Sequence, residues 1–103
     1  MFEKQKLVDK FITENNIEAD FMVRTLDVIS ELGEVSKEIL KGTDYGKTSL
    51  AINEKIIMEM GDLIFSTLAL ANSLEMNLDY SLDKAIEKYK MRLRKGSPGS
   101  END

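Results

Sequence analysis

The sequence predicts an all-α protein built as a four-helix antiparallel bundle. A single proline, six glycines, four phenylalanines, three tyrosines and no tryptophan disfavour an architecture of strands and tight turns. Alanine, leucine, isoleucine, glutamate and lysine, which favour helices, are frequent. A chain of 103 residues forms one hydrophobic core. We therefore expect one helical domain over residues 1–95, followed by a disordered tail of linker composition over residues 96–103.

The four helices follow from apolar periodicity and from the residues that interrupt it. We expect them over residues 2–15, 18–41, 48 or 49 to 74, and 80–94. The asparagine pair at 15–16 separates the first two, Gly42 ends the second, and Asn77-Leu78-Asp79 separates the last two. The helix over 48–74 is apolar on much of its circumference, which is typical of a central helix.

Composition and charge exclude several classes of function. The chain has no cysteine and no histidine, so thiolate chemistry, the usual zinc sites and a histidine base are excluded. A bound metal must then be a hard cation with oxygen ligands, such as magnesium, manganese or calcium. The formal net charge of −5 argues against a nucleic-acid polymer or an anionic membrane as a partner. No signal peptide or transmembrane run is evident, so we expect a soluble, cytoplasmic protein.

An acidic row runs along the second predicted helix. Its members, at spacings of four, three and four, are Asp27, Glu31, Glu34 and Glu38. Like charges at these spacings repel by roughly a few tenths of a kcal/mol per pair, so the row requires a compensating cation unless it is a solvated face.

The third predicted helix repeats the pattern with Glu59 and Asp62 beside its apolar face. If the two helices pack antiparallel, these carboxylates face Glu31 and Glu34 across the seam. Four converging carboxylates stay ionised only when something neutralises them, and one or two magnesium ions, or manganese, do so directly. The alternative is the solvated surface of a helical bundle.

Basic residues form a second strip. Three basic residues recur every fourth residue on the last helix: Lys84, Lys88 and Arg92. A further lysine, Lys55, lies one turn before Glu59 on the third helix. Phosphate binding and simple helix-end solubility are both consistent with the strip on the last helix. Lys55 is either a structural counter-ion or a phosphate ligand.

The order Glu31-Leu-Gly-Glu34, a loop, and then Glu59-Met-Gly-Asp62 resembles the signature of the MazG-like nucleoside triphosphate pyrophosphohydrolases. The resemblance covers residues 21–92. Ser30 and Met58 stand where many relatives carry a further acid.

The resemblance implies magnesium-dependent hydrolysis of nucleoside triphosphates between the α and β phosphates, giving a nucleoside monophosphate and pyrophosphate. It implies metal ligands at the four motif acids, with Glu34 or Glu38 orienting or deprotonating the attacking water. Nucleotide-pool house-cleaning is the expected role. A homodimer or homotetramer is expected, because one small subunit covers the apolar third helix poorly.

Two other classes compete with the hydrolase. A di-iron carboxylate bundle uses Glu-x-x-His pairs, and this chain has no histidine. A non-catalytic helical dimerisation or regulatory module explains the amphipathic helices but gives the acidic row no purpose.

Overall fold

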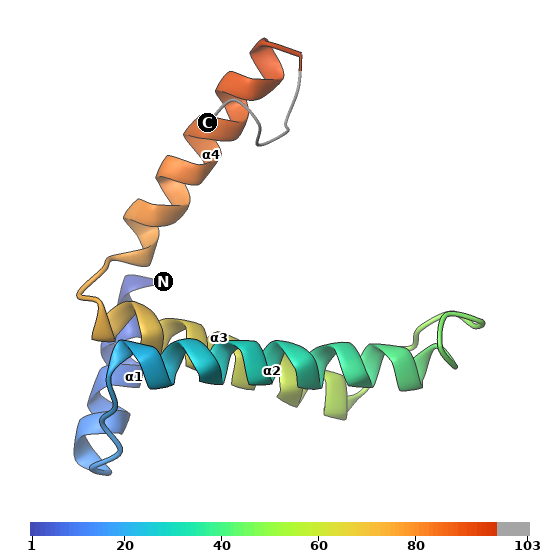
Figure 1. The fold of residues 1–103 in the computed structure, drawn as a ribbon, viewed down its shortest axis with the longest axis horizontal. Helices are drawn as coiled ribbons and strands as arrows, with labels where there is room; N and C mark the ends of the chain where they lie inside the picture. The colour runs from blue at the N-terminus through green and yellow to red at the C-terminus, as the bar shows by residue number, and fades with distance from the viewer. Residues whose placement is uncertain (97–103) are drawn as a thin grey trace.

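The computed structural model describes residues 1–96 as four helices joined by short connections (Figure 1). No strand occurs within that range, so the predicted all-α class and the number of helices are confirmed. The helices are α1 (Phe2–Glu14), α2 (Phe21–Gly42), α3 (Glu54–Ser73) and α4 (Leu78–Arg94). The tail predicted to be disordered lies outside the described residues from 97 onward.

The starts of three helices differ from the prediction because side-chain caps fix them. Helix α2 begins at Phe21 instead of residue 18, since the Asp20 carboxylate accepts the Val23 N–H at 3.1 Å. Helix α3 begins at Glu54 instead of residue 48 or 49. There the side chain of Asn53 accepts the Ile56 N–H at 2.9 Å.

Helix α4 begins at Leu78, two residues earlier than predicted. Asn77 caps it by accepting the N–H groups of Asp79 and Tyr80. The predicted ends of the first three helices differ by one residue, where the last turn meets its connection.

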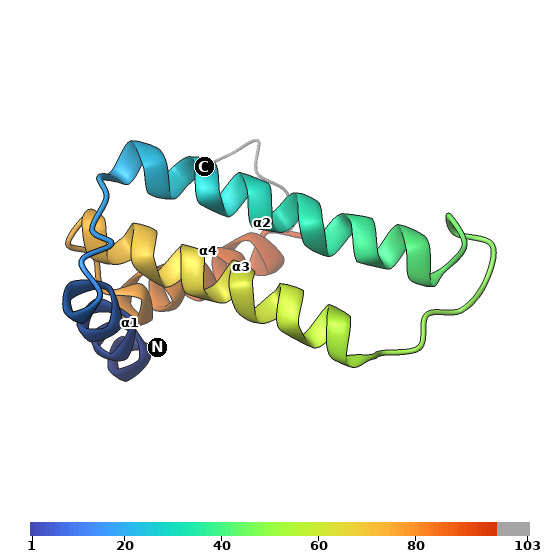
Figure 2. The same cartoon turned by 90° about the horizontal axis from the view of Figure 1, so that it is seen from below.

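Helices α2 and α3 form an antiparallel pair that lies side by side along most of its length (Figure 2). Val35 and Ile56 are buried in this pair. Helix α1 crosses the C-terminal half of α3, and their core is a cluster of Val8, Ile12, Leu68 and Ala69. By length and composition alone α3 could cross a membrane, but central helices of soluble proteins meet the same test.

Helix α4 projects away from the other three, which gives the subunit an L shape (Figure 1). The radius of gyration is 16.7 Å, whereas a compact chain of this length has about 13 Å. The four helices are consistent with the predicted helical bundle, but within one subunit α4 packs little against the other three.

Candidate metal centre

Three carboxylates converge at the middle of the α2–α3 pair. Oxygen atoms of Glu31 on α2 and of Glu59 and Asp62 on α3 all lie within 4.8 Å of one another. Glu31 and Glu59 are half-buried and Asp62 is exposed. The antiparallel packing produces this convergence, because Glu31 lies one turn before buried Val35 and Glu59 lies one turn after the start of α3, close to buried Ile56.

The donor set fits a hard divalent cation. Magnesium takes oxygen ligands at about 2.0–2.1 Å, so two ligands of one ion lie roughly 3–4 Å apart. Small side-chain rotations of Glu31, Glu59 and Asp62 bring their oxygens from the observed separation to that range. Water molecules complete the coordination of such an ion.

The electrostatics of Glu31 also favour a cation. Partial burial raises the pKa of the Glu31 carboxyl above its usual range, and the charges of Asp62, Glu59, Glu34 and Asp27 raise it further. A bound cation stabilises the ionised form and removes this penalty.

The two ends of the acidic row on α2 are neutralised by the chain itself. Arg24, which is buried, lies 3.6 Å from the Asp27 carboxylate and donates to the Ile17 carbonyl. At the other end, Lys41 lies 3.5 Å from Glu38. Sequence reasoning did not assign either pairing, although the spacing of three residues is a recognisable signal.

The centre of the row has no such partner. Within residues 1–96 no lysine or arginine forms an ion pair with Glu31, Glu34 or Asp62. Glu59 has one weak pairing, with Lys55 at 4.0 Å. The acids around the convergence point are thus less well paired than the two ends of the row on α2.

Glu34 and Glu38 stand apart from the three converging carboxylates. Glu34 is exposed and acts on Glu31 only through its charge. Glu38 lies seven residues from Glu31, which is about 10 Å along a helix. Its side chain is only 11% exposed and is paired with Lys41, so it is held away from the centre.

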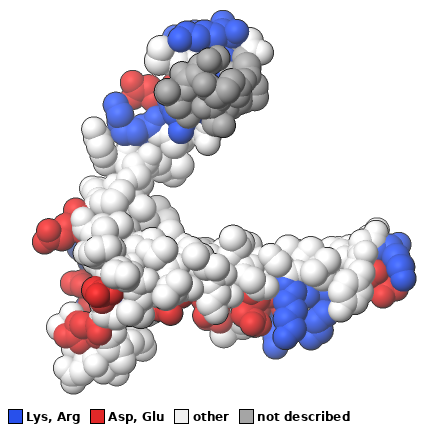
Figure 3. Space-filling model, in the orientation of Figure 1, with Lys and Arg blue, Asp and Glu red and all other residues white. Residues whose placement is uncertain are grey.

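The predicted phosphate-binding residues fall into two places. Lys55 lies on α3 beside the converging carboxylates. Lys84, Lys88 and Arg92 lie on α4, and the structure does not bring them to the same centre within one subunit. Figure 3 shows this separation: acidic and basic side chains lie along the edge of the α2–α3 arm that faces away from α4, and a separate basic group lies on α4.

The comparisons with known proteins give one match. A model of the MazG nucleotide pyrophosphohydrolase domain matches residues 23–98, which is most of the chain and includes all three converging carboxylates. Helix α1 lies before the matched range. No curated protein and no solved structure matches the chain. The matched family typically depends on a divalent metal, in agreement with the acidic donor set.

Proposed function

Because the chain belongs to the MazG nucleotide pyrophosphohydrolase family, we propose that it hydrolyses nucleoside triphosphates between the α and β phosphates. The products are a nucleoside monophosphate and pyrophosphate. The observation that carries the proposal is the convergence of Glu31, Glu59 and Asp62 inside the matched segment. We propose nucleotide-pool house-cleaning in the cytoplasm as the role.

In this proposal Glu31, Glu59 and Asp62 hold magnesium, or manganese, against the phosphates. A divalent ion there supplies neutralisation of phosphate charge and makes a nearby water easier to deprotonate. Phosphoryl transfer depends mainly on positioning and charge neutralisation, so a site without histidine, cysteine or a serine triad is adequate.

Glu34 is the better candidate for orienting the attacking water and accepting its proton. It is exposed, three residues from Glu31, and has no ion pair within residues 1–96. Glu38 is the weaker candidate because Lys41 holds its carboxylate. The water oxygen bonds to the α phosphorus. The bond between that phosphorus and the oxygen that bridges the α and β phosphates breaks, and pyrophosphate leaves with the bridging oxygen.

Lys55 supplies positive charge beside the metal ligands, where it contacts a phosphate in place of Glu59. Lys84 and Lys88 serve phosphates bound by a neighbouring subunit. This assignment requires an assembly, since α4 points away from the acidic edge of its own subunit (Figure 3). Arg92 is the weaker candidate, because it is buried and its guanidinium lies 5.4 Å from the centre of the Tyr89 ring.

We propose a homodimer or homotetramer on the basis of exposed area. The chain exposes 7731 Å², whereas a compact monomer of 11.7 kDa exposes about 5,900 Å². The excess is larger than the roughly 800 Å² that each partner buries in a standard interface. Much of it is apolar, as in Leu26, Ile29 and Leu82, which are all more than half exposed.

Product analysis tests the proposed reaction. The protein is incubated with canonical and modified nucleoside triphosphates in magnesium, and the products are separated by ion-exchange chromatography. We expect nucleoside monophosphate and pyrophosphate. A nucleoside diphosphate and orthophosphate would contradict the reaction while leaving the metal site intact.

A matched pair of variants tests the site. Glu59→Gln removes one charge from the metal centre, and we expect it to abolish turnover and the increase in unfolding temperature that magnesium produces. Glu54→Gln makes the same change at an exposed position on α3 and should keep both. The absence of any response to magnesium in the unaltered protein would favour the non-catalytic module.

A further inference from the structure

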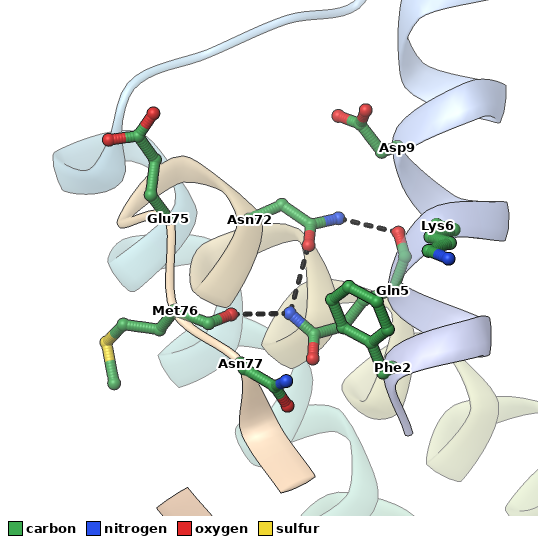
Figure 4. A pocket seen from close by; sticks show the side chains of 8 residues that line it. All are labelled: Phe2, Gln5, Lys6, Asp9, Asn72, Glu75, Met76 and Asn77. Atoms are coloured by element: carbon green, nitrogen blue, oxygen red, sulfur yellow. Dashed lines mark hydrogen bonds between the residues drawn. The ribbon is translucent and has the colours of Figure 1, made fainter. Parts of the chain in front are cut away.

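Gln5 is a polar side chain buried at the point where three helices meet. It lies on α1 and is only 3% exposed. Its Nε2 donates to Asn72 Oδ1 at 3.1 Å and to the Met76 carbonyl at 2.7 Å, and its Oε1 accepts the Leu78 N–H at 2.8 Å. The Asn72 amide donates in return to the Gln5 carbonyl at 2.9 Å (Figure 4). Every polar atom of the Gln5 side chain is thus used to connect α1 to α3 and α4.

These hydrogen bonds fall on both sides of the connection between α3 and α4. The end of α3 is already fixed, because the Met76 N–H bonds to the Ala71 carbonyl at 2.9 Å and Glu75 adopts a left-handed φ of 55°. The direction of α4 is then decided by the backbone from Met76 to Leu78. Gln5 holds the carbonyl at the start of that stretch and the N–H at its end.

Packing does not fix this connection on its outer side. A hollow of about 310 Å³ opens beside the hydrogen bonds, lined by Phe2, Lys6 and Asp9 of α1 and by Glu75, Met76 and Asn77 (Figure 4). Two further polar links reach Asp79 on α4, from the Phe2 N–H at 3.2 Å and from the Met1 ammonium at 3.1 Å. Both are exposed to solvent and hence weaker than buried bonds.

We propose that Gln5 is a positioning residue that sets the direction in which α4 leaves α3. Helix α1, which lies outside the matched family segment, then acts as the support of the α4 arm. The 17 residues of α4 extend about 25 Å, so a rotation of about 10° at Leu78 moves its far end by about 4 Å.

Spin-label distances measure this direction, and the absence of native cysteine allows clean labelling. One pair, Lys37→Cys with Lys90→Cys, reports α2 to α4. A second, Lys37→Cys with Glu54→Cys, reports α2 to α3. Labelled protein is diluted with unlabelled protein so that only distances within one chain contribute. The variant Gln5→Met keeps the size of the side chain but loses its three side-chain hydrogen bonds. In this variant we expect the α2–α4 distance distribution to broaden or shift by several ångströms and the α2–α3 distance distribution to stay unchanged.

Val8→Ala is the control for lost packing, since Val8 belongs to the core cluster against which Leu78 packs but makes no side-chain hydrogen bond to the connection. An α2–α4 distribution that is unchanged in Gln5→Met, or equally changed in Val8→Ala, would overturn the proposal. If Gln5→Met does not fold, Asn72→Ala removes two of the four bonds, and the same criteria apply. The distances do not depend on the proposed hydrolysis, so the two proposals fail separately.

Discussion

The α2–α3 pair and helix α4 are both amphipathic, but only the pair finds its apolar partner within the subunit. Val35 and Ile56 are buried between α2 and α3. On α4 the corresponding residues are 43–64% exposed, and they form a stripe at spacings of four, three and four: Leu82, Ile86, Tyr89 and Leu93. An isolated helix of this length is marginal in water, and residues 1–96 leave this stripe exposed, which supports the proposed assembly.

The two regions also divide the charges between them. The pair carries the converging carboxylates, and α4 carries Lys84 and Lys88, each about 160° around the helix from Ile86. Burying the stripe, which we name the α4 apolar stripe, therefore leaves these lysines accessible. An assembly that covers the stripe does not compete with a role of the lysines in phosphate binding.

The largest expected effect is on assembly. Ile86→Lys places a charge in the α4 apolar stripe and removes an apolar side chain whose burial contributes about 1.5–3 kcal/mol. In a two-fold dimer the loss occurs twice, so we expect dissociation to be favoured by at least about 100-fold. Analytical ultracentrifugation at several concentrations measures this dissociation.

The control is Met91→Lys, which adds the same charge on the opposite side of α4 and should leave the assembly intact. A stable, active 11.7 kDa monomer of the unaltered chain would refute the premise.

A smaller effect is expected for phosphate binding by α4. Lys88→Ala should raise KM for a nucleoside triphosphate about tenfold, as expected when one hydrogen bond to a charged group is lost. Lys90→Ala, at an exposed position on another side of α4, should change KM little. Steady-state kinetics measure both.

Mixed subunits sharpen this prediction. Combining Glu59→Gln subunits with Lys88→Ala subunits should restore part of the activity if each site takes residues from two chains. Activity that remains at the level of the separate variants would place Lys88 outside the neighbour's site.

Sequence reasoning was accurate where local rules decide the outcome. Apolar periodicity gave the four helices and placed Glu31, Glu59 and Asp62 on facing surfaces. Helix starts were less accurate, because Thr48, Ser49 and Asn53 are all able to cap a helix and the sequence alone did not choose between them. Glu34 does not join the cluster, although its spacing from Glu31 equals the spacing of Asp62 from Glu59, so the spacing alone did not distinguish the two acids.

The direction of α4 was not accessible to the sequence analysis, because it depends on contacts between distant parts of the chain. Gln5 is more than sixty residues from its partners. A signal was nevertheless present: Gln5, Val8 and Ile12 follow a spacing of three and four, so Gln5 occupies a buried position of an amphipathic helix. A polar residue there indicates a required hydrogen-bond partner.

The metal centre should destabilise the metal-free protein slightly. Burial and neighbouring acids raise the pKa of Glu31 above its ordinary value of 4.5. The folded state then binds a proton more tightly than the unfolded state, so this contribution to stability is fully present below pH 4.5 and is lost as pH rises through the raised pKa. We expect Glu31→Gln to raise the unfolding temperature at pH 7 in EDTA and to have little effect at pH 4. Magnesium should stabilise the unaltered protein and not the variant. A fall in stability at pH 7 in EDTA would contradict this account.

The smallest expected effect asks whether the outer face of α2 is covered in the assembly. Gly33 lies in an exposed row with Met22, Leu26, Ile29 and Leu40, and a methyl group added there meets nothing within 4 Å in the chain. On helix propensity alone Gly33→Ala stabilises α2 by about 0.5–1 kcal/mol. We expect that gain in the Ile86→Lys background, where the subunits are apart.

We propose that a second chain packs closely against the exposed apolar row around Gly33, and in the assembled protein we therefore expect the sign to reverse. The measurement is a double-mutant cycle in urea, with the free energy of unfolding determined for Gly33→Ala in both backgrounds at fixed protein concentration. Coupling between Gly33 and Ile86, which lie on helices without extensive mutual contact in one subunit, would connect the outer face of α2 to the α4 apolar stripe through the assembly. An equal gain in both backgrounds would show that this face of α2 stays in solvent, and the partner of α4 would then have to be sought on α1 or α3.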